Sequence, residues 1–346
     1  MKRAIGRACI VALIAALAGG AAWAAAPDAA KPEPAKSPSA EPVDKIMGDY
    51  VGAFTPADKN AGVKAEAAVV AEGGGSYRAV LLIPKSAEAA RPDRYELAGK
   101  GDEKKVTLAG SGPSQEWTGA IEAGKLAASS KAGKAELKFT VKTSPALGAK
   151  PPAGAVILIP YAEGKPPSLG EWAAPAWKPQ DDGSVVAAGA DIHTNRKFGD
   201  IQLHAEFRLP VEPAGRGQDR GNSGVYIQDL YEIQILDSFG RPLGPSECGS
   251  VYTQTAPTAC ACLPPGAWQT FDITFRAPRF DADGKKVKDA AVTVVHNGVK
   301  VQDRTAIAGP TGQAKGRPEV AAGVLRLQYH GHPVSFRNVW LVELKD

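Results

Sequence analysis

Apolar and polar residues alternate cleanly in the second half of the chain. In Asp200–Leu209, apolar residues occupy every second position, and polar or charged residues stand between them. The same alternation recurs in Gln269–Arg276 and Val324–His330. A period of two predicts strands with one face in a core and the other face polar. Several antiparallel strands of this kind predict a β-sandwich.

The stretch Gly221–Asp237 reads as two further strands with a reversal at Asp229-Leu230. Its second strand carries Glu232, Gln234 and Asp237 among apolar residues. Period-two spacing puts the first two on one face, whereas Asp237 reaches that face only through a bulge. Because carboxylates are costly on a wholly buried strand, we expect this face to line an open, concave polar groove.

The first half predicts a separate, smaller domain. Residues 43–160 read as short strands broken by glycine-rich segments, with no helical period between them. This pattern favours an antiparallel meander or small barrel, for which an accessory role is the default expectation. A proline-rich segment at 160–179 marks the boundary. The predicted fold class is therefore all-β, with a C-terminal sandwich over 168–346 preceded by a smaller antiparallel β domain.

The N-terminus has the composition of an export signal. Three basic residues precede the apolar run 8–18, and small residues follow it. This pattern predicts a signal peptide over 1–26, and the Pro/Ala-rich segment 27–42 reads as a disordered linker. We therefore expect a secreted or periplasmic protein. Without the signal the chain is nearly neutral, which argues against nucleic acid as a partner, and no later apolar stretch is long enough for a membrane span.

Three cysteines follow the signal segment: Cys248, Cys260 and Cys262. In an oxidising compartment we expect a disulfide of Cys248 with Cys260 or Cys262. A metal site is the alternative, but three thiols at this spacing are not a zinc pattern. His296 lies at the Asn-Gly signal of a tight hairpin, and its claim to a functional role is correspondingly weak.

Glu232, Asp237 and His330 are the candidate catalytic residues. Their E-x-Q-x-x-D pattern is similar to the E-x-D-x-x-E arrangement of laminarinase-like sandwich glycosidases, which use two carboxylates. The amide in the middle position weakens that mechanism here. His330 is the best proton-transfer group because imidazole titrates near neutral pH. Glu232 and His330 also suit a divalent metal, which is the one cofactor left open.

The polar strand faces supply the candidate substrate-binding residues. These are Glu206, Arg208, Asn222, Gln234, Arg326 and Gln328. We expect the strands of Glu206 and Arg208 and of Arg326 and Gln328 to face Glu232 across the groove. The alternative interpretation is that the acids are solvated surface charges paired with Arg208 and Arg326.

Several motifs follow one another in a characteristic order. They are Gly221-Asn-Ser-Gly224, Tyr231-Glu-Ile-Gln-Ile-Leu-Asp237, Pro265-Gly-Ala-Trp-Gln-Thr-Phe-Asp272, Val295-His-Asn-Gly298 and Leu325-Arg-Leu-Gln-Tyr-His-Gly331. With this order the region 168–346 resembles the 3-keto-disaccharide hydrolase domain family. The resemblance implies a concanavalin-like jelly roll and an oligosaccharide or glycoside substrate oxidised to a ketone at C3.

A C3 ketone acidifies the proton at C2, so a base can remove it and expel the C1 substituent, after which water adds. On this hypothesis Glu232 or His330 is the base, and Arg208 or Arg326 polarises the ketone. Two alternatives stay open: a conventional glycosidase that uses Glu232 and Asp237, and a carbohydrate-binding module without turnover.

Overall fold

The computed structural model describes residues 44–59, 61–84 and 91–345. The predicted signal peptide and linker lie outside these residues. The described chain consists of strands, with two short 3-10 helices, η1 (Gly112–Ser114) and η2 (Gly312–Ala314). This architecture confirms the all-β prediction. Within the same residues, no helix has the length and apolar character that crossing a membrane requires.

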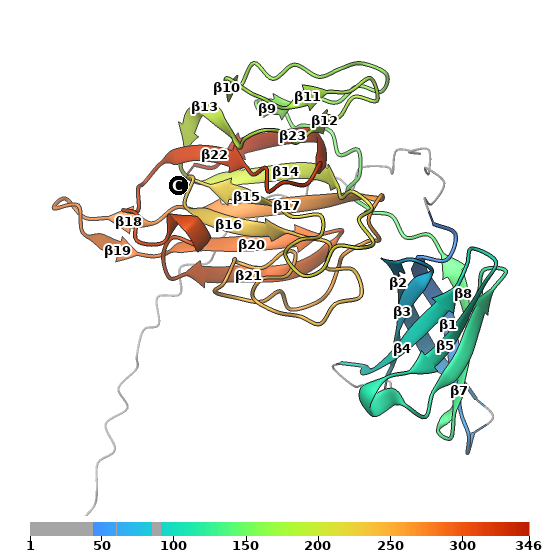
Figure 1. The fold of residues 1–346 in the computed structure, drawn as a ribbon. Helices are drawn as coiled ribbons and strands as arrows, with labels where there is room; N and C mark the ends of the chain where they lie inside the picture. The colour runs from blue at the N-terminus through green and yellow to red at the C-terminus, as the bar shows by residue number, and fades with distance from the viewer. Residues whose placement is uncertain (1–43, 60, 85–90, 346) are drawn as a thin grey trace, which may run out of the picture. The chain divides into compact units, whose positions relative to one another are not determined.

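The first eight strands form a closed antiparallel barrel in which β8 pairs back onto β1 (Figure 1). The strands are β1 (Gly48–Pro56), β2 (Val63–Gly73), β3 (Ser76–Ile83), β4 (Asp93–Gly101), β5 (Lys105–Gly110), β6 (Thr118–Glu122), β7 (Lys125–Ser130) and β8 (Gly133–Thr140). Buried residues alternate with exposed ones along β5, β7 and most of β8, and the barrel has its own core around Tyr50, Trp117 and Leu137. The closing pair needs Gly52, because a Cβ there would lie 2.1 Å from the Glu136 carbonyl oxygen.

The remaining strands form a sandwich of two sheets (Figure 1). The smaller sheet has the order β10 (Trp172–Ala173), β13 (Ile192–Phe198), β22 (Gly323–Leu327), β15 (Ser223–Ile227), β16 (Tyr231–Ile235). The larger sheet has the order β11 (Lys178–Pro179), β12 (Val185–Val186), β23 (Ser335–Glu343), β14 (Ile201–Arg208), β17 (Trp268–Arg276), β20 (Ala290–His296), β21 (Val299–Ile307), and β9 (Val156–Ile159) pairs with β23. A separate ribbon joins β18 (Arg279–Phe280) and β19 (Lys286–Lys288).

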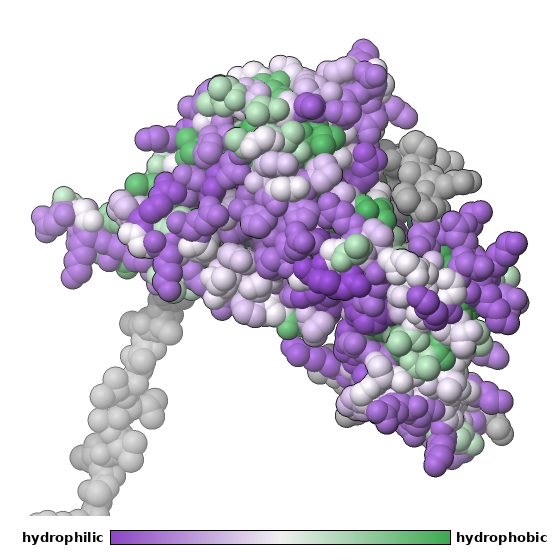
Figure 2. All heavy atoms as spheres, viewed as in Figure 1, coloured by the Kyte–Doolittle hydropathy of each residue, from purple (hydrophilic) through white to green (hydrophobic). Residues whose placement is uncertain are grey.

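One hydrophobic core fills the space between the two sheets. Leu203 and Phe207 of β14 belong to the same buried cluster as Ile233 of β16 and Leu327 of β22. The polar residues that alternate with them therefore point away from the core on both sheets. Over the face of the sandwich turned to the viewer, the space-filling surface is largely hydrophilic (Figure 2).

Two tight hairpins fix the registers that matter for the site. Between β15 and β16, Gln228 and Asp229 adopt left-handed backbone angles (φ 58° and 57°), and Leu230 N–H donates to the Ile227 carbonyl at 3.1 Å. Such angles match the twist of a hairpin. The Asn-Gly hairpin is also confirmed, because β20 and β21 meet at Asn297 (φ 49°) and Gly298 (φ 80°).

Candidate functional site

Glu232 lies on β16, and neighbouring segments enclose its carboxylate. Tyr226 of β15 is its direct cross-strand partner, and the phenol donates a 2.6 Å hydrogen bond to Glu232 Oε2. The backbone N–H of Glu232 donates to Thr311 Oγ1 at 2.8 Å. Gly224 leaves space for the carboxylate, because a Cβ there would lie 2.6 Å from Glu232 Oε1. Glu232 is only 2% exposed as a result.

Burial raises the pKa of Glu232 to about 7, against the opposing effects of the Tyr226 hydrogen bond and the positive charge of Arg326. A carboxyl group with this pKa is present as acid and as base near neutral pH, which suits a group that takes up and returns a proton. Burial also raises the pKa of Tyr226 above its usual range. The phenol therefore keeps its proton and serves as a hydrogen-bond donor.

Arg326 places a positive charge over the same cross-strand pair. Its guanidinium carbon lies 3.6 Å from the centroid of the Tyr226 ring. Nη1 contacts Asp191 Oδ2 and Nε contacts Asp229 Oδ1, each at 2.7 Å. Because two carboxylates fix the guanidinium on an aromatic ring, its orientation is set before any ligand arrives.

Two buried amides beside the carboxylate have an unused acceptor. Gln328 donates to the Tyr226 hydroxyl at 3.3 Å, and Gln234 donates to Gln218 Oε1 at 2.9 Å. Within the described residues, neither Gln328 Oε1 nor Gln234 Oε1 has a hydrogen-bond partner. Asn222 is tied to the same network, since its amide donates to the Gln218 carbonyl at 2.8 Å. Buried acceptors without partners cost stability, and hydroxyl groups of a ligand would satisfy them.

The predicted open groove is a covered polar layer in this structure. Backbone hydrogen bonds join Tyr252 N–H to the Glu232 carbonyl (3.0 Å) and Gln234 N–H to the Ser250 carbonyl (3.1 Å). Gly312 closes over the carboxylate, since a Cβ there would lie 3.2 Å from Glu232 Oε2. The loop that follows β16 and the remote segment around Gly312 therefore reduce the exposure that the strand pattern alone predicts.

Asp237 lies beyond the end of β16 and is held by a different partner. Its Oδ2 accepts a short hydrogen bond from Arg220 Nε, and Oδ1 accepts from Phe239 N–H at 3.3 Å. Asp237 is 2% exposed, and burial raises its pKa. The structure thus places the predicted second carboxylate in a buried ion pair, outside the Tyr226–Glu232–Arg326 cluster.

His330 is exposed just after β22, and its ring stacks on that of His332 with centroids 6.5 Å apart. His332 in turn contacts Glu212 Oε2 at 2.6 Å. In the described part of the chain, Glu232 and His330 do not belong to a set of three or more His, Cys, Asp or Glu atoms close enough to share a metal ion. The metal role of Glu232 and His330 therefore stays a prediction without support from the geometry.

Glu206 and Arg208 do not face Glu232, which corrects the predicted groove wall. They project from β14, a strand of the larger sheet, whereas Glu232 and Arg326 project from strands of the smaller sheet. Alternation fixes which side chains leave the core, but not the sheet to which a strand belongs. Glu206 is completely buried and accepts from Arg337 Nε at 2.7 Å.

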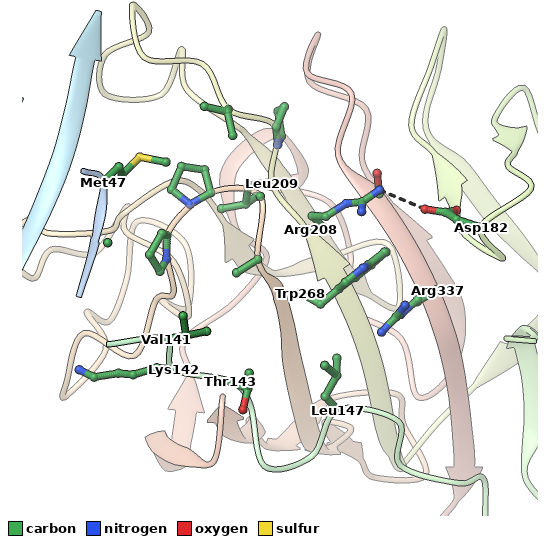
Figure 3. A pocket seen from close by; sticks show the side chains of 18 of the residues that line it. Met47, Val141, Lys142, Thr143, Leu147, Asp182, Arg208, Leu209, Trp268 and Arg337 are labelled. Atoms are coloured by element: carbon green, nitrogen blue, oxygen red, sulfur yellow. Dashed lines mark hydrogen bonds and ion pairs between the residues drawn. The ribbon is translucent and has the colours of Figure 1, made fainter. Parts of the chain in front are cut away.

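Arg208 lines a different cavity, of about 770 Å³, together with Trp268 and Arg337 (Figure 3). Arg208 reaches Asp182 at 3.3 Å, and both guanidiniums lie over the Trp268 ring, at 4.7 and 4.2 Å from its centroid. Because the ring already carries these two cations, it is not a free platform for a sugar.

Tyr226, Asp191 and Asp229 are site residues that the sequence reasoning missed. Tyr226 has only a partial signal: the hairpin is readable, but the reversal predicted at Asp229-Leu230 would place Ile227 opposite Glu232 instead. The two aspartates have none, since Asp191 precedes β13 and Asp229 lies in the hairpin turn. Cys248, Cys260 and Cys262 are free thiols in the structure, so the disulfide also stays a prediction.

Comparison with known proteins gives one family and one fold. Residues 158–342 match the family model described as "3-keto-alpha-glucoside-1,2-lyase-like domain". The chain is 38% identical to a solved structure from Parabacteroides distasonis ATCC 8503 described as a "putative glycosyl hydrolase", over 56% of this chain and 84% of that chain, with a TM-score of 0.50. A second structure of the same description and organism is 21% identical over 49% of this chain and 84% of that chain, with a TM-score of 0.36. No match was found among curated proteins.

Proposed function

Because the chain belongs to the 3-keto-alpha-glucoside-1,2-lyase-like domain family, we propose that it is an exported carbohydrate-active enzyme that cleaves 3-keto-glycosides by β-elimination followed by addition of water. The matched region contains β15, β16 and β22, the strands that carry the cluster around Glu232. The observation that carries the proposal is the buried Glu232 carboxylate, whose pKa of about 7 makes it a competent base near neutral pH.

Each step has a candidate group. Glu232 removes the C2 proton, and the electron pair of that bond moves into the enolate of the C3 ketone. The positive charge of Arg326 stabilises the enolate oxygen. The enolate then re-forms the C3 carbonyl and expels the substituent at C1. The leaving oxygen receives the proton that Glu232 had removed. Addition of water to the resulting enone, with a proton returned to C2, completes the cleavage.

The amides supply recognition. The free Oε1 atoms of Gln234 and Gln328 would accept hydrogen bonds from sugar hydroxyls, and Asn222 positions Gln218 beneath Gln234. A ligand must displace part of the cover over Glu232 to reach these groups, so opening of the segment around Gly312 belongs to the proposal.

The experiment compares substrates and variants. The purified chain is incubated with a 3-keto-disaccharide and with its unoxidised parent, with and without chelator. We expect cleavage of the keto sugar alone, insensitive to chelator, and loss of activity in Glu232→Gln. Glu116→Gln is the matched control, because Glu116 is exposed on the barrel.

Other outcomes point to the alternatives. Cleavage of the parent sugar alone would exclude elimination and favour the two-carboxylate glycosidase. Binding of either sugar without turnover would identify a carbohydrate-binding module. Activity that survives in Glu232→Gln but disappears in His330→Gln would move the base to His330. Chelator sensitivity that His330→Gln abolishes would bring back the divalent metal at Glu232 and His330.

A further inference from the structure

Two cysteines and a histidine converge beneath the loop that joins β16 to β17. Ligand atoms of Cys248, Cys262 and His296 all lie within 4.8 Å of one another. The three residues come from separate parts of the sequence: Cys248 and Cys262 from the loop, and His296 from the end of β20. They are 3%, 9% and 0% exposed, respectively. The cluster is therefore an interior feature and not a chance meeting of surface side chains.

Hydrogen bonds fix the tautomer of His296. Gln269 Oε1 accepts from Leu263 N–H at 3.0 Å and from the Asn297 side-chain amide at 3.1 Å, and both of these groups can only donate. The same oxygen lies 3.0 Å from His296 Nε2, so Nε2 must carry the proton. The lone pair of the imidazole is left on Nδ1.

Nδ1 of His296 has no hydrogen-bond partner within the described residues, although it is completely buried. The ring cannot turn away easily, because it packs against Phe271 and Phe207 with centroids 4.9 and 5.9 Å apart. A buried lone pair without a partner destabilises the fold unless something absent from the chain itself occupies the site.

We infer that Cys248, Cys262 and Nδ1 of His296 bind a soft d¹⁰ metal ion, Zn²⁺ or Cu⁺, as a structural site. Thiolate sulfur and imidazole nitrogen are the ligands that these ions prefer. Ligand atoms around a tetrahedral zinc lie roughly 3.5–3.8 Å apart, given bonds of about 2.3 Å to sulfur and 2.0 Å to nitrogen. The observed cluster needs only a small contraction to reach that geometry. The Nε2–H bond to Gln269 is the kind of outer hydrogen bond that orients metal-binding histidines.

Cys260 lies beside this set of three, on the solvent side, and would supply a fourth ligand after a small movement. It is exposed, its thiol lies within hydrogen-bonding reach of Cys262, and its Sγ is 3.6 Å from the Ser238 carbonyl. Binding displaces one proton from each thiol that coordinates the ion. A Cys248–Cys262 disulfide is the competing state, but it would consume both sulfurs and leave His296 Nδ1 without a partner.

The site would hold the loop that covers Glu232. Gly249, next to Cys248, donates its N–H to the Gln234 carbonyl at 2.8 Å, and Tyr252 of the same loop donates to the Glu232 carbonyl at 3.0 Å. A metal ion that fixes Cys248 to β20 therefore also fixes the loop to β16. This role does not depend on the proposed catalytic reaction.

The test quantifies the metal bound to the protein and needs no substrate. The full chain is purified without chelator, and zinc and copper are quantified by mass spectrometry. About one equivalent per chain is expected, and replacement by Co²⁺ should give thiolate-to-cobalt charge-transfer bands. Cys248→Ser, Cys262→Ser and His296→Gln should lose the metal and the bands. His193→Gln is the matched control and should keep the metal with unchanged affinity, because His193 lies on β13, outside the cluster. Cys260→Ser should keep the metal with lowered affinity, because water can take the open position.

If these variants do not fold, a second measurement on the wild-type protein tests the inference. Reduced, chelator-treated wild-type protein should gain thermal stability when ZnSO₄ is added, and Cys248 and Cys262 should become protected from alkylation. An intact mass two hydrogens below that of the reduced chain, with no bound metal, would establish the disulfide and overturn the inference. Reactive thiols at Cys248, Cys260 and Cys262, with no zinc, copper or cobalt bound after reduction and metal addition, would overturn it as well.

Discussion

Tyr226 and Glu232 face each other across the β15–β16 hairpin, and the phenol donates a 2.6 Å hydrogen bond to the carboxylate. The bond stabilises the ionised form of a carboxyl group whose pKa burial raises to about 7. Burial and this hydrogen bond have opposite effects on the pKa of Glu232. The tyrosine therefore helps to set the pH above which the carboxylate can act as a base.

The activity should rise with pH through about 7, because a general base works only when Glu232 has lost its proton. Tyr226→Phe removes a hydrogen bond to a charged group, worth about 1.5–3 kcal/mol, and should move the acid limb of the profile up by about one to two pH units. Rates of both proteins on a 3-keto-disaccharide from pH 5 to 9 check this. An unmoved limb would show that another group controls the profile.

Glu232→Gln should abolish turnover and yet stabilise the fold at alkaline pH. The folded-state pKa of Glu232 is raised from 4.5 to about 7, so the stability it contributes is complete below pH 4.5 and is lost as pH rises through about 7. The neutral amide avoids this loss and should add about 1–3 kcal/mol to the free energy of unfolding at pH 8. Urea titrations at pH 5 and pH 8 measure the difference, which should shrink at the lower pH.

Arg326→Lys should slow turnover by about 100-fold, because an ammonium group cannot bridge Asp191 and Asp229 while it covers the Tyr226 ring. Arg317→Lys is the control, since Arg317 contacts the same Asp229 at 2.9 Å but lies further out, with its side chain 49% exposed. Steady-state rates of the two variants should differ sharply. An equal loss of rate in both variants would mean that turnover depends on the ion pair with Asp229 and not on the position of the Arg326 guanidinium.

Gly224→Ala should lower kcat by about 10- to 100-fold while the protein stays folded, because the new methyl group displaces the Glu232 carboxylate. The Cβ would lie 2.6 Å from Oε1. Gly170→Ala is the control, since its Cβ would meet nothing nearer than Ser168 Oγ at 3.6 Å. Kinetics and circular dichroism of both variants separate a displaced carboxylate from general unfolding.

Asp237→Asn should lower the free energy of unfolding by about 3–5 kcal/mol, because it leaves the buried Arg220 charge without its counter-charge. Turnover per folded molecule should stay within a few-fold of wild type. Denaturation and rates measured at low temperature check both. A loss of rate as large as that of Glu232→Gln would restore Asp237 as a catalytic carboxylate.

Period-two alternation predicted the strands well. β14 lies within the predicted range 200–209, and β17 and β22 each begin one residue before the predicted ranges 269–276 and 324–330. It could not assign strands to sheets, because the β14 pattern is the same whichever sheet it joins. Glu206 and Arg208 were therefore predicted to face Glu232 and instead lie on the opposite side of the sandwich.

The sequence could not predict that the site is buried, for a related reason. The groups that cover Glu232, Thr311 and Tyr252, are distant in sequence and lie in segments without a period. His296 was set aside because its hairpin is evident from Asn297-Gly298, yet the same hairpin carries the imidazole to Cys248 and Cys262. Local patterns report conformation, whereas a site depends on which loops fold back onto a strand.

β16 is the last strand of the smaller sheet, and the loop beside it supplies its outer hydrogen bonds, including the bridge from Ile233 to Val251. A bare outer strand is a template on which another chain can add, and that is how many proteins begin to aggregate. Release of the loop would uncover such a template along the very residues that flank Glu232. Selection for solubility would then preserve Gly249 and Val251 in a chain that had lost every trace of catalysis.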